Sequence, residues 1–195
     1  MTPCQTILKL FYPLWMMFSK LTGIRAKYFS NNTAKPAASF YNLHAVLNNG
    51  ERLDFASLRN KKVLIVNTAS DCGYTPQYAQ LQQLHKQFEN KLAVLGFPAN
   101  DFKHQEKGSD EAIAKFCTTN FGVEFPLMKK SVVKKNEAQN EVFQWLTDKN
   151  KNGWNNKQPS WNFSKYLIDE EGRLTHYFDP SVSPVSKEVV DAINC

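Results

Sequence analysis

Cys72 occupies the position in this chain that most favours thiol chemistry. It follows a continuous apolar run at residues 62–68 through a short link, and a helix start follows it directly at residues 73–76. A thiol at a strand-to-helix turn lies near the positive end of the helix dipole, which stabilises the thiolate, the nucleophilic form. Location alone leaves two interpretations open: a reactive cysteine suited to redox or acyl chemistry, or a small buried hydrophobe, as most free cysteines are.

The remaining cysteines narrow the chemistry. The chain has four cysteines and no C-x-x-C pair, so a metal site is poorly supported and we expect neither a metal nor another cofactor. A domain of this length needs no disulfide staples. Cys117 shares a predicted helix face with Ile113 and Phe116, which by itself favours a core thiol. Cys4 and Cys195 lie at or near the chain ends and receive no role.

Composition and charge indicate one globular domain with a basic leading segment. Hydrophobic residues make up 42% of the 195 residues and aromatic residues 13%. The formal net charge is +6, of which residues 1–36 carry +5 and residues 37–195 carry +1. A nearly neutral domain lacks the electrostatic footprint of a phosphate-backbone binder, so we expect no nucleic-acid partner.

The first 36 residues form a separate basic and aromatic segment. The apolar run at residues 5–24 is interrupted by Lys9, Pro13 and Lys20, so it falls short of the about 20 apolar residues that a spanning helix needs. We expect an uncleaved amphipathic helix that lies in a membrane interface or docks on a partner, in a cytoplasmic and membrane-associated protein. A signal for export to the periplasm is the alternative. Residues 31–36 then read as a linker to a domain at residues 37–195.

Patterning over residues 37–195 predicts a three-layer α/β domain with a mixed sheet. Asn49-Gly50 supplies the positive φ angles of a tight hairpin turn between two short runs. Thr75 is the expected N-cap of the helix after Cys72, and Ser109 of a later one. Further elements follow from the apolar periodicity: strands at 62–68, 92–97, 163–168 and 174–178, and helices at 139–146 and after Pro184.

Three separated motifs, taken together, carry a family resemblance. They are residues 66–75 around Cys72, residues 95–106 with the run Phe97-Pro98-Ala99-Asn100, and residues 161–167, which begin Trp161-Asn162. In this order and spacing they closely resemble the glutathione peroxidase family. The resemblance covers about residues 39–195. It implies a thioredoxin-like fold, with a mixed central sheet flanked by helices on both faces and an N-terminal β-hairpin.

The resemblance also implies a catalytic group. The family's peroxidatic cysteine, glutamine, tryptophan and asparagine correspond to Cys72, Gln105, Trp161 and Asn162. Attack on a peroxide O–O bond needs a thiolate, and neutral N–H donors can stabilise the sulfur and position the peroxide. Without the family pattern, Trp161 is better explained by core packing and Gln105 by a surface loop.

The second motif differs from the family pattern, and two carboxylates near the site are unfavourable for a thiolate. The second motif has Ala99, Asp101 and Lys103 where the family commonly has Cys, Gln and Gly. Asp101, together with Asp71, would oppose formation of the thiolate. We expect the helix start and the neutral donors to hold the pKa of Cys72 down despite these two carboxylates.

The resemblance extends to how the oxidised enzyme is reduced. Cys117 resembles the resolving cysteine of the thioredoxin-dependent branch, which implies a Cys72–Cys117 disulfide reduced by thioredoxin or glutathione. A disulfide needs Cα atoms within about 7 Å, so the helix at residues 109–120 must unfold locally if it holds Cys117 further away.

The chain between residues 126 and 161 lacks the insertion that tetrameric family members use for assembly. The resemblance therefore implies a monomer with an open site around Cys72. Such a site would admit hydrogen peroxide and bulky organic or lipid hydroperoxides.

Three other functions compete with a thiol peroxidase. A peroxide sensor that relays its disulfide to a partner protein would use the same cysteines. A thiol–disulfide oxidoreductase would explain Cys72 as a C-x-x-C motif with its second thiol lost. A cysteine acyltransferase or protease needs a histidine partner, and His44, His85, His104 and His176 show no supporting local signature.

Overall fold

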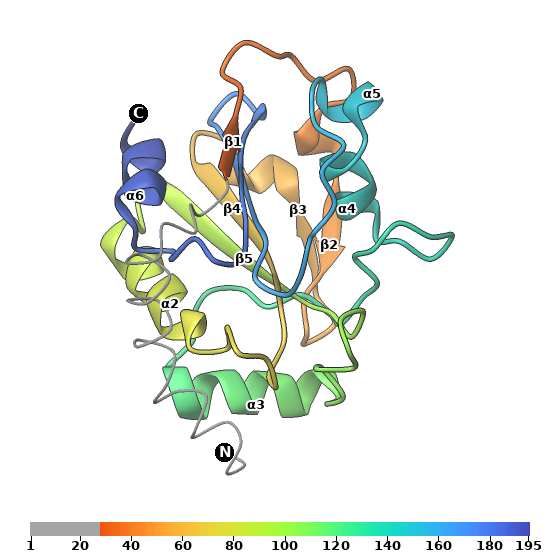
Figure 1. Ribbon diagram of the computed structural model, residues 1–195, viewed down its shortest axis with the longest axis vertical. Coiled ribbons are helices and arrows are strands. Elements are labelled where there is room, and N and C mark those ends of the chain that lie inside the picture. The colour runs from red at the N-terminus through yellow and green to blue at the C-terminus, as the bar shows by residue number, and fades with distance from the viewer. Residues whose placement is uncertain (1–27) are drawn as a thin grey trace.

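A five-stranded mixed sheet forms the centre of the computed structural model, which describes residues 28–195 (Figure 1). The strand order is β1-β7-β6-β4-β5, with β4 and β5 parallel and the other neighbours antiparallel. The strands are β1 (Tyr28–Ser30), β4 (Lys62–Thr68), β5 (Leu92–Pro98), β6 (Lys165–Ile168) and β7 (Leu174–Phe178). The predicted mixed sheet is confirmed.

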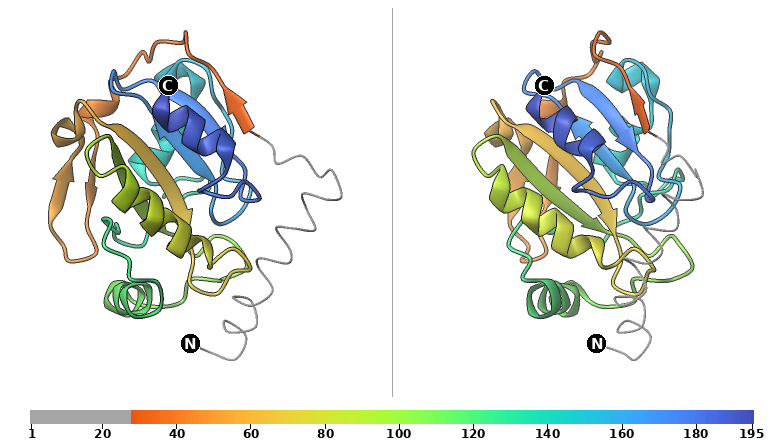
Figure 2. Two further views of the ribbon diagram at one scale, coloured as in Figure 1. Left: turned by 90° about the vertical axis from the view of Figure 1, so that its left-hand side faces the viewer. Right: turned by 60° about the vertical axis from the view of Figure 1, so that its left-hand side comes forward.

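Helices cover both faces of this sheet. Figure 2 shows α2 (Gln77–Gln87) and α6 (Lys187–Asn194) on one face, and α4 (Glu141–Leu146) and α5 (Lys149–Asn152) on the other. The apolar strand β4 serves both layers because its side chains alternate in direction. Leu64 and Val66 join the core under α2 and α6, whereas Val63 and Ile65 join the core under α4.

α3 (Asp110–Phe121) runs across one end of the sheet (Figure 1). It begins where expected, because the Ser109 hydroxyl accepts a hydrogen bond from the Ala112 N–H. It ends at Gly122, whose φ of 62° is the left-handed conformation of a helix C-cap. Its inward residues are Ile113 and Cys117.

The predicted hairpin is present as β2 (His44–Val46) and β3 (Arg52–Asp54), and Gly50 takes a φ of 90° at its tip. The apolar run before it is not strand throughout. Residues Phe40–Asn42 form a 3₁₀ turn, η1, which buries Phe40 against Phe55 of η2 (Phe55–Leu58). Burial of these two rings overrides the strand propensity of the run.

Two predicted helix starts are displaced. α2 begins at Gln77, and Thr75 makes no N-cap bond to it. The Thr75 hydroxyl instead accepts from the Cys72 N–H at 3.0 Å and donates to the Ala69 carbonyl at 2.9 Å, so it shapes the turn that carries the thiol. α4 begins after Asn140, whose side chain accepts from the Val142 N–H.

One strand comes from a part of the chain that patterning did not assign to the sheet. β1 lies upstream of residue 37 and pairs with β7 as an edge strand, with Tyr28 opposite Phe178. The segment at residues 5–24 lies outside the described residues. Among residues 28–195, no helix is long and apolar enough to cross a membrane.

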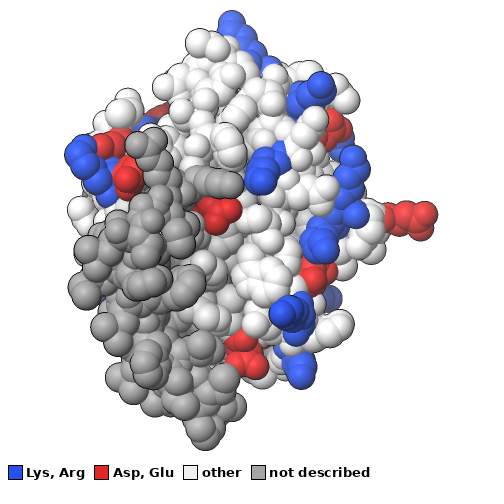
Figure 3. All heavy atoms as spheres, in the orientation of Figure 1, with Lys and Arg blue, Asp and Glu red and all other residues white. Residues whose placement is uncertain are grey.

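Charged side chains of both signs share the surface. In the view of Figure 3, lysine and arginine are interspersed with aspartate and glutamate over the described part of this face. Within residues 28–195, no three His, Cys, Asp or Glu side chains gather in a way that could hold a metal ion.

Candidate active site

The thiol of Cys72 lies in the loop between β4 and α2, beneath the surface. The side chain is 1% exposed, and its sulfur accepts a hydrogen bond from the Tyr74 N–H at 3.4 Å. The side-chain N–H groups of Asn162 and Trp161 lie close enough to favour the thiolate, since both lower the pKa of Cys72. Two segments far apart in sequence therefore supply neutral N–H groups to one sulfur atom.

Gln105 joins this group through Asn162. The Asn162 amide donates to the Gln105 side-chain oxygen at 2.9 Å, and the Gln105 carbonyl accepts from the Asp71 N–H at 3.0 Å. The oxygen of the Asn162 amide is buried and has no hydrogen-bond partner among residues 28–195. The four residues expected from the family pattern, Cys72, Gln105, Trp161 and Asn162, thus lie together, with an unused acceptor among them.

Asn67, on β4, fixes the turn that carries Trp161 and Asn162. Its amide donates to the Trp161 carbonyl and accepts from the Ser164 N–H, each at 3.1 Å, and its own carbonyl accepts from the Phe163 N–H at 2.6 Å. Sequence reasoning did not assign a role to Asn67. The available signal was a fully buried strand whose apolar run ends in a polar residue.

Burial governs the ionisation of the thiol. It raises the pKa of Cys72 above the ordinary value of 9.0, although the donors from Tyr74, Asn162 and Trp161 lower it, and the Asp71 carboxylate adds to the rise. The expectation that the helix start and the donors would hold this pKa down is therefore wrong. The loss of hydration destabilises the thiolate more than these donors stabilise it.

Asp101 does not take the part expected of it. Its carboxylate accepts hydrogen bonds from the Val133 N–H at 2.6 Å and the Lys134 N–H at 3.1 Å, which ties two loops together. Of the two acidic residues expected to oppose thiolate formation, Asp71 alone acts on the pKa of Cys72.

Trp161 stands at the rim of the site. Its ring lies 5.4 Å from that of Phe102, centroid to centroid, and the Lys103 ammonium lies 5.9 Å from its ring centre. This rim places an aromatic surface and a cation beside the donor group.

Cys117 is an unpaired thiol inside α3. Its side chain is fully buried in the core cluster that also contains Cys72. Burial raises the pKa of Cys117 to about 12, with the Tyr78 hydroxyl lowering it and the Glu106 carboxylate raising it further. In this state Cys117 is protonated and held in place by helix packing.

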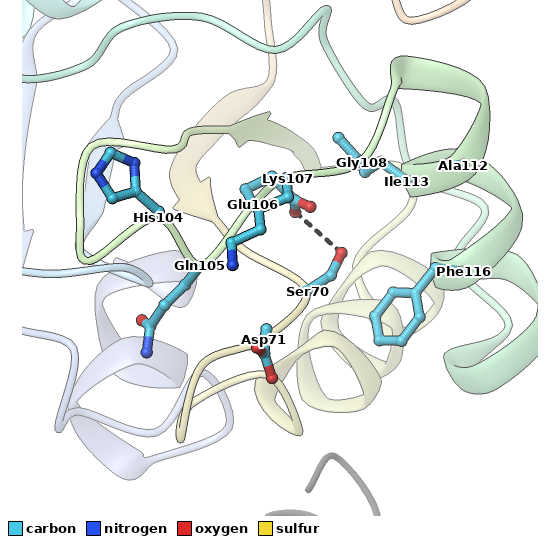
Figure 4. A pocket seen from close by; sticks show the side chains of 10 residues that line it. All are labelled: Ser70, Asp71, His104, Gln105, Glu106, Lys107, Gly108, Ala112, Ile113 and Phe116. Atoms are coloured by element: carbon cyan, nitrogen blue, oxygen red, sulfur yellow. Dashed lines mark hydrogen bonds between the residues drawn. The ribbon is translucent and has the colours of Figure 1, made fainter. Parts of the chain in front are cut away.

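A pocket of about 250 Å³ opens between the second motif and α3 (Figure 4). Glu106 is 1% exposed, and its carboxylate accepts a hydrogen bond from the Ser70 hydroxyl at 2.9 Å. Burial raises the pKa of Glu106 to about 7, although the Ser70 hydrogen bonds and Lys130 lower it. The pocket is lined by Ser70, Asp71, His104, Gln105, Glu106, Lys107, Gly108, Ala112, Ile113 and Phe116.

Glu106 was missed by sequence reasoning, although it follows Gln105 directly in the second motif. Its carboxylate acts on both Cys117 and Tyr78. The pocket therefore joins the loop before Cys72 to the helix that holds the second thiol.

The family model described as Glutathione peroxidase matches residues 40–147 of this chain. The chain is 43% identical over 149 residues to "Glutathione peroxidase-like peroxiredoxin 2" of Saccharomyces cerevisiae, covering 76% of this chain and 91% of that protein. Among solved structures it is similar to one titled "Crystal structure of Trgpx in apo form", with a TM-score of 0.61 and 28% identity over 82% of this chain and 97% of that one.

A more distant likeness concerns the fold. A thiol:disulfide interchange protein of the thioredoxin family from Chlorobium tepidum has a TM-score of 0.51 at 18% identity, over 84% of this chain and 96% of that one. The expected thioredoxin-like architecture is confirmed.

Proposed function

The chain belongs to the glutathione peroxidase family, and we propose that Cys72 is the residue through which it reduces hydroperoxides. It is a cysteine-based oxidoreductase acting on peroxide. The observation that carries the assignment of Cys72 is that its sulfur meets N–H donors from Tyr74, Trp161 and Asn162.

In the first step the Cys72 thiolate attacks one oxygen of the hydroperoxide. An S–O bond forms, the O–O bond breaks, and the thiol becomes a sulfenic acid while the hydroperoxide becomes an alcohol or water. The proton lost by the thiol ends on the departing oxygen. The unpartnered Asn162 oxygen can accept the O–H of the incoming hydroperoxide, and the N–H donors can stabilise the charge as it moves.

In the second step the Cys117 thiol attacks the sulfur of the sulfenic acid. An S–S bond forms and the hydroxyl leaves as water with the Cys117 proton. We propose that α3 loosens before this step, because Cys117 is fully buried on the inner face of that helix. A dithiol of the thioredoxin type would then return two electrons to the disulfide, with glutathione as the alternative reductant.

Peroxide consumption at steady state tests this scheme. Wild type, Cys72→Ser and Cys117→Ser are each supplied with hydrogen peroxide and either thioredoxin or glutathione. We expect Cys72→Ser to be inactive, and Cys117→Ser to complete one oxidation but fail to recycle with thioredoxin. Continued thioredoxin-dependent turnover by Cys117→Ser would show that another group resolves the sulfenic acid.

The composition of the leading segment supports a proposal for the organic substrate and the place of action. We propose that residues 5–24, which mix basic and aromatic residues, hold a cytoplasmic monomer at a membrane surface, where lipid hydroperoxides form. Export to the periplasm is the alternative that a cleaved N-terminus, found by mass spectrometry of the mature protein, would favour.

A further inference from the structure

Lys165 is a fully buried lysine with a complete set of acceptors. It stands at the first position of β6 and is 0% exposed. Its ammonium donates to the Val182 carbonyl at 2.7 Å, the Phe163 carbonyl at 2.8 Å and the Pro180 carbonyl at 3.4 Å. An ammonium has three N–H groups, so each finds an oxygen, whereas a neutral amine would have only two to offer.

The Phe163 carbonyl belongs to the turn that carries the donor residues. Phe163 follows Asn162 directly and has a φ of 66°, in the left-handed region that a bulky residue rarely adopts. Such conformations persist only where the surroundings hold them, and they gather at functional sites. Lys165 supplies one of the bonds that hold this one.

The Pro180 carbonyl links the lysine to the other side of the site. The Pro180 carbonyl also accepts from the Gln77 amide at 2.7 Å, and Gln77 is the first residue of α2, the helix that follows Cys72. One ammonium therefore connects the strained turn after Asn162, the loop at residues 180–182 and the helix beyond the nucleophile.

We propose that Lys165 is a positioning residue for hydroperoxide reduction, because it fixes the Trp161–Asn162 turn relative to the loop at residues 180–182 and, through that loop, to α2, the helix that follows Cys72. The inference rests on the function proposed above and assigns a role to a residue that touches neither sulfur nor substrate. Donors aimed at a reacting atom lose most of their effect when they are displaced by about 1 Å, so a loosened turn slows the reaction without removing any donor.

Burial disfavours the charged form of Lys165, whereas a nearby carboxylate favours it. Burial lowers the pKa of Lys165 to about 7, and the nearby Asp179 carboxylate raises it. Asp179 itself accepts from the Ser160 hydroxyl at 3.0 Å, and Ser160 precedes Trp161. Both ends of the donor turn are thus tied to the chain at residues 179–182.

The test replaces Lys165 by methionine, which keeps the stem and removes the nitrogen. Two rates are measured on the reduced full chain: oxidation of Cys72 by hydrogen peroxide in a single turnover, and alkylation of Cys72 by iodoacetamide as a function of pH. We expect peroxide oxidation to slow by about tenfold or more, and the apparent pKa of Cys72 to rise, because two of its donors lose alignment.

Lys62→Met is the matched control. Lys62 is also a buried lysine of the sheet, but it lies at the other end of β4 and donates to the Ala192 carbonyl. It should leave both readouts unchanged. If folded Lys165→Met oxidises like wild type, the inference is overturned while the peroxidase function stands. If wild type itself fails to react with peroxide, the proposed function fails.

A second variant covers the outcome that Lys165→Met does not fold. Gln77→Met removes the amide that shares the Pro180 carbonyl and leaves Lys165 intact. We expect a smaller loss in the same direction, about threefold, with the same rise in the apparent pKa of Cys72. Wild-type values for this variant would overturn the inference.

Discussion

The surroundings of Cys72 favour its neutral thiol over the reactive thiolate. Burial raises its pKa, and three N–H donors oppose that rise without cancelling it. The reactive species is therefore a minority at neutral pH. The donors matter chiefly while negative charge moves from sulfur to the departing oxygen.

This balance predicts a rate that increases with pH into the alkaline range. Because the pKa of Cys72 lies above 9.0, the rate constant for oxidation by hydrogen peroxide should still increase with pH above pH 8. Stopped-flow oxidation of the reduced protein between pH 6 and pH 10 measures this. A plateau reached below pH 7 would mean that the thiolate is stabilised more strongly than the contacts of Cys72 explain.

Trp161→Phe separates the indole N–H from the ring. The change keeps an aromatic group against Phe102 but removes one donor to Cys72. The peroxide rate constant should fall by about 100-fold, as when an oxyanion donor is lost. Trp154→Phe is a suitable control, since the Trp154 indole donates to the Leu174 carbonyl away from the thiol. Equal losses in both variants would point to a general packing defect.

Glu106→Gln tests the buried carboxyl group through stability. The folded pKa of about 7 lies above the ordinary 4.5, so the native state holds a proton that the unfolded state releases between these values. Stability from this group is complete below about pH 4.5 and is lost as the pH rises through about 7. The free energy of unfolding of Glu106→Gln, relative to that of wild type, should increase by about 3 kcal/mol from pH 4.5 to pH 8. Urea unfolding of both proteins at pH 4.5 and pH 8 measures the two free energies. If the variant differs from wild type by the same amount at both pH values, the prediction is wrong.

The sequence was sufficient to identify residues whose side chains have a recognisable chemical role. Cys72 could be found from its strand-to-helix location, whereas Gln105 and Asn162 came from the family resemblance. Asn67 and Lys165 were missed because their work is done through backbone carbonyls and N–H groups that no motif displays. Asp101 was misjudged because the partners of its carboxylate lie about 30 residues further along the chain.

Among the elements, α3 holds Cys117, to which we assign the second step. It is held by the Ser109 cap at its start and by Gly122 at its end, and its inner face keeps Cys117 from water. A short helix at the surface can open locally at a fraction of the global free energy of unfolding. Formation of the disulfide should therefore follow the stability of this one element.

Gly122→Ala weakens α3 from its end. A φ of 62° strains an alanine by about 1 kcal/mol, which raises the population of the open helix and should speed disulfide formation about fivefold. The rate of Cys72–Cys117 bond formation after one equivalent of peroxide gives the measurement. Gly50→Ala, with a φ of 90° at the hairpin tip and nothing within 4 Å of the added carbon, imposes a similar strain elsewhere. If both variants resolve at the same rate, opening of α3 does not limit the step.

Local patterns predicted most elements and failed where tertiary contacts decide. The strands β4 and β7 and the cap of α3 follow from apolar runs and a serine before acidic residues. The start of α2 does not, because the Thr75 hydroxyl binds the thiol turn instead of the helix. β1 is short and exposed, and among the described strands it pairs with β7 alone, so no periodicity marks it.

At the scale of the whole molecule, the register of the strands shows which end of the sheet each segment lies at. Val66, near the end of β4 that leads to Cys72, pairs with Lys165, which pairs with Phe178, and Phe178 pairs with Tyr28. The first described residue therefore lies at the end of the sheet where the thiol is found. A deletion that tests the leading segment must stop before Tyr28, because β1 is part of the sheet.

Deletion of residues 1–27 should affect one substrate and spare another. Reduction of hydrogen peroxide in solution should stay at the wild-type rate, whereas reduction of phospholipid hydroperoxide in anionic vesicles should fall about tenfold, since surface attachment concentrates enzyme and substrate. Both rates are measured with the same reductant. Equal rates on vesicles would remove the membrane role from the leading segment.

The pairing of Tyr28 with Phe178 also limits geometry beyond the domain. If the chain entered the sheet at its opposite end, a linker as long as the domain would be needed to bring a substrate bound by the leading segment to the Cys72 sulfur. Tyr28 instead lies at the end of the sheet that leads to Cys72. We therefore expect that a flexible spacer inserted before Tyr28 lowers the rate on vesicle-bound hydroperoxide as its length increases.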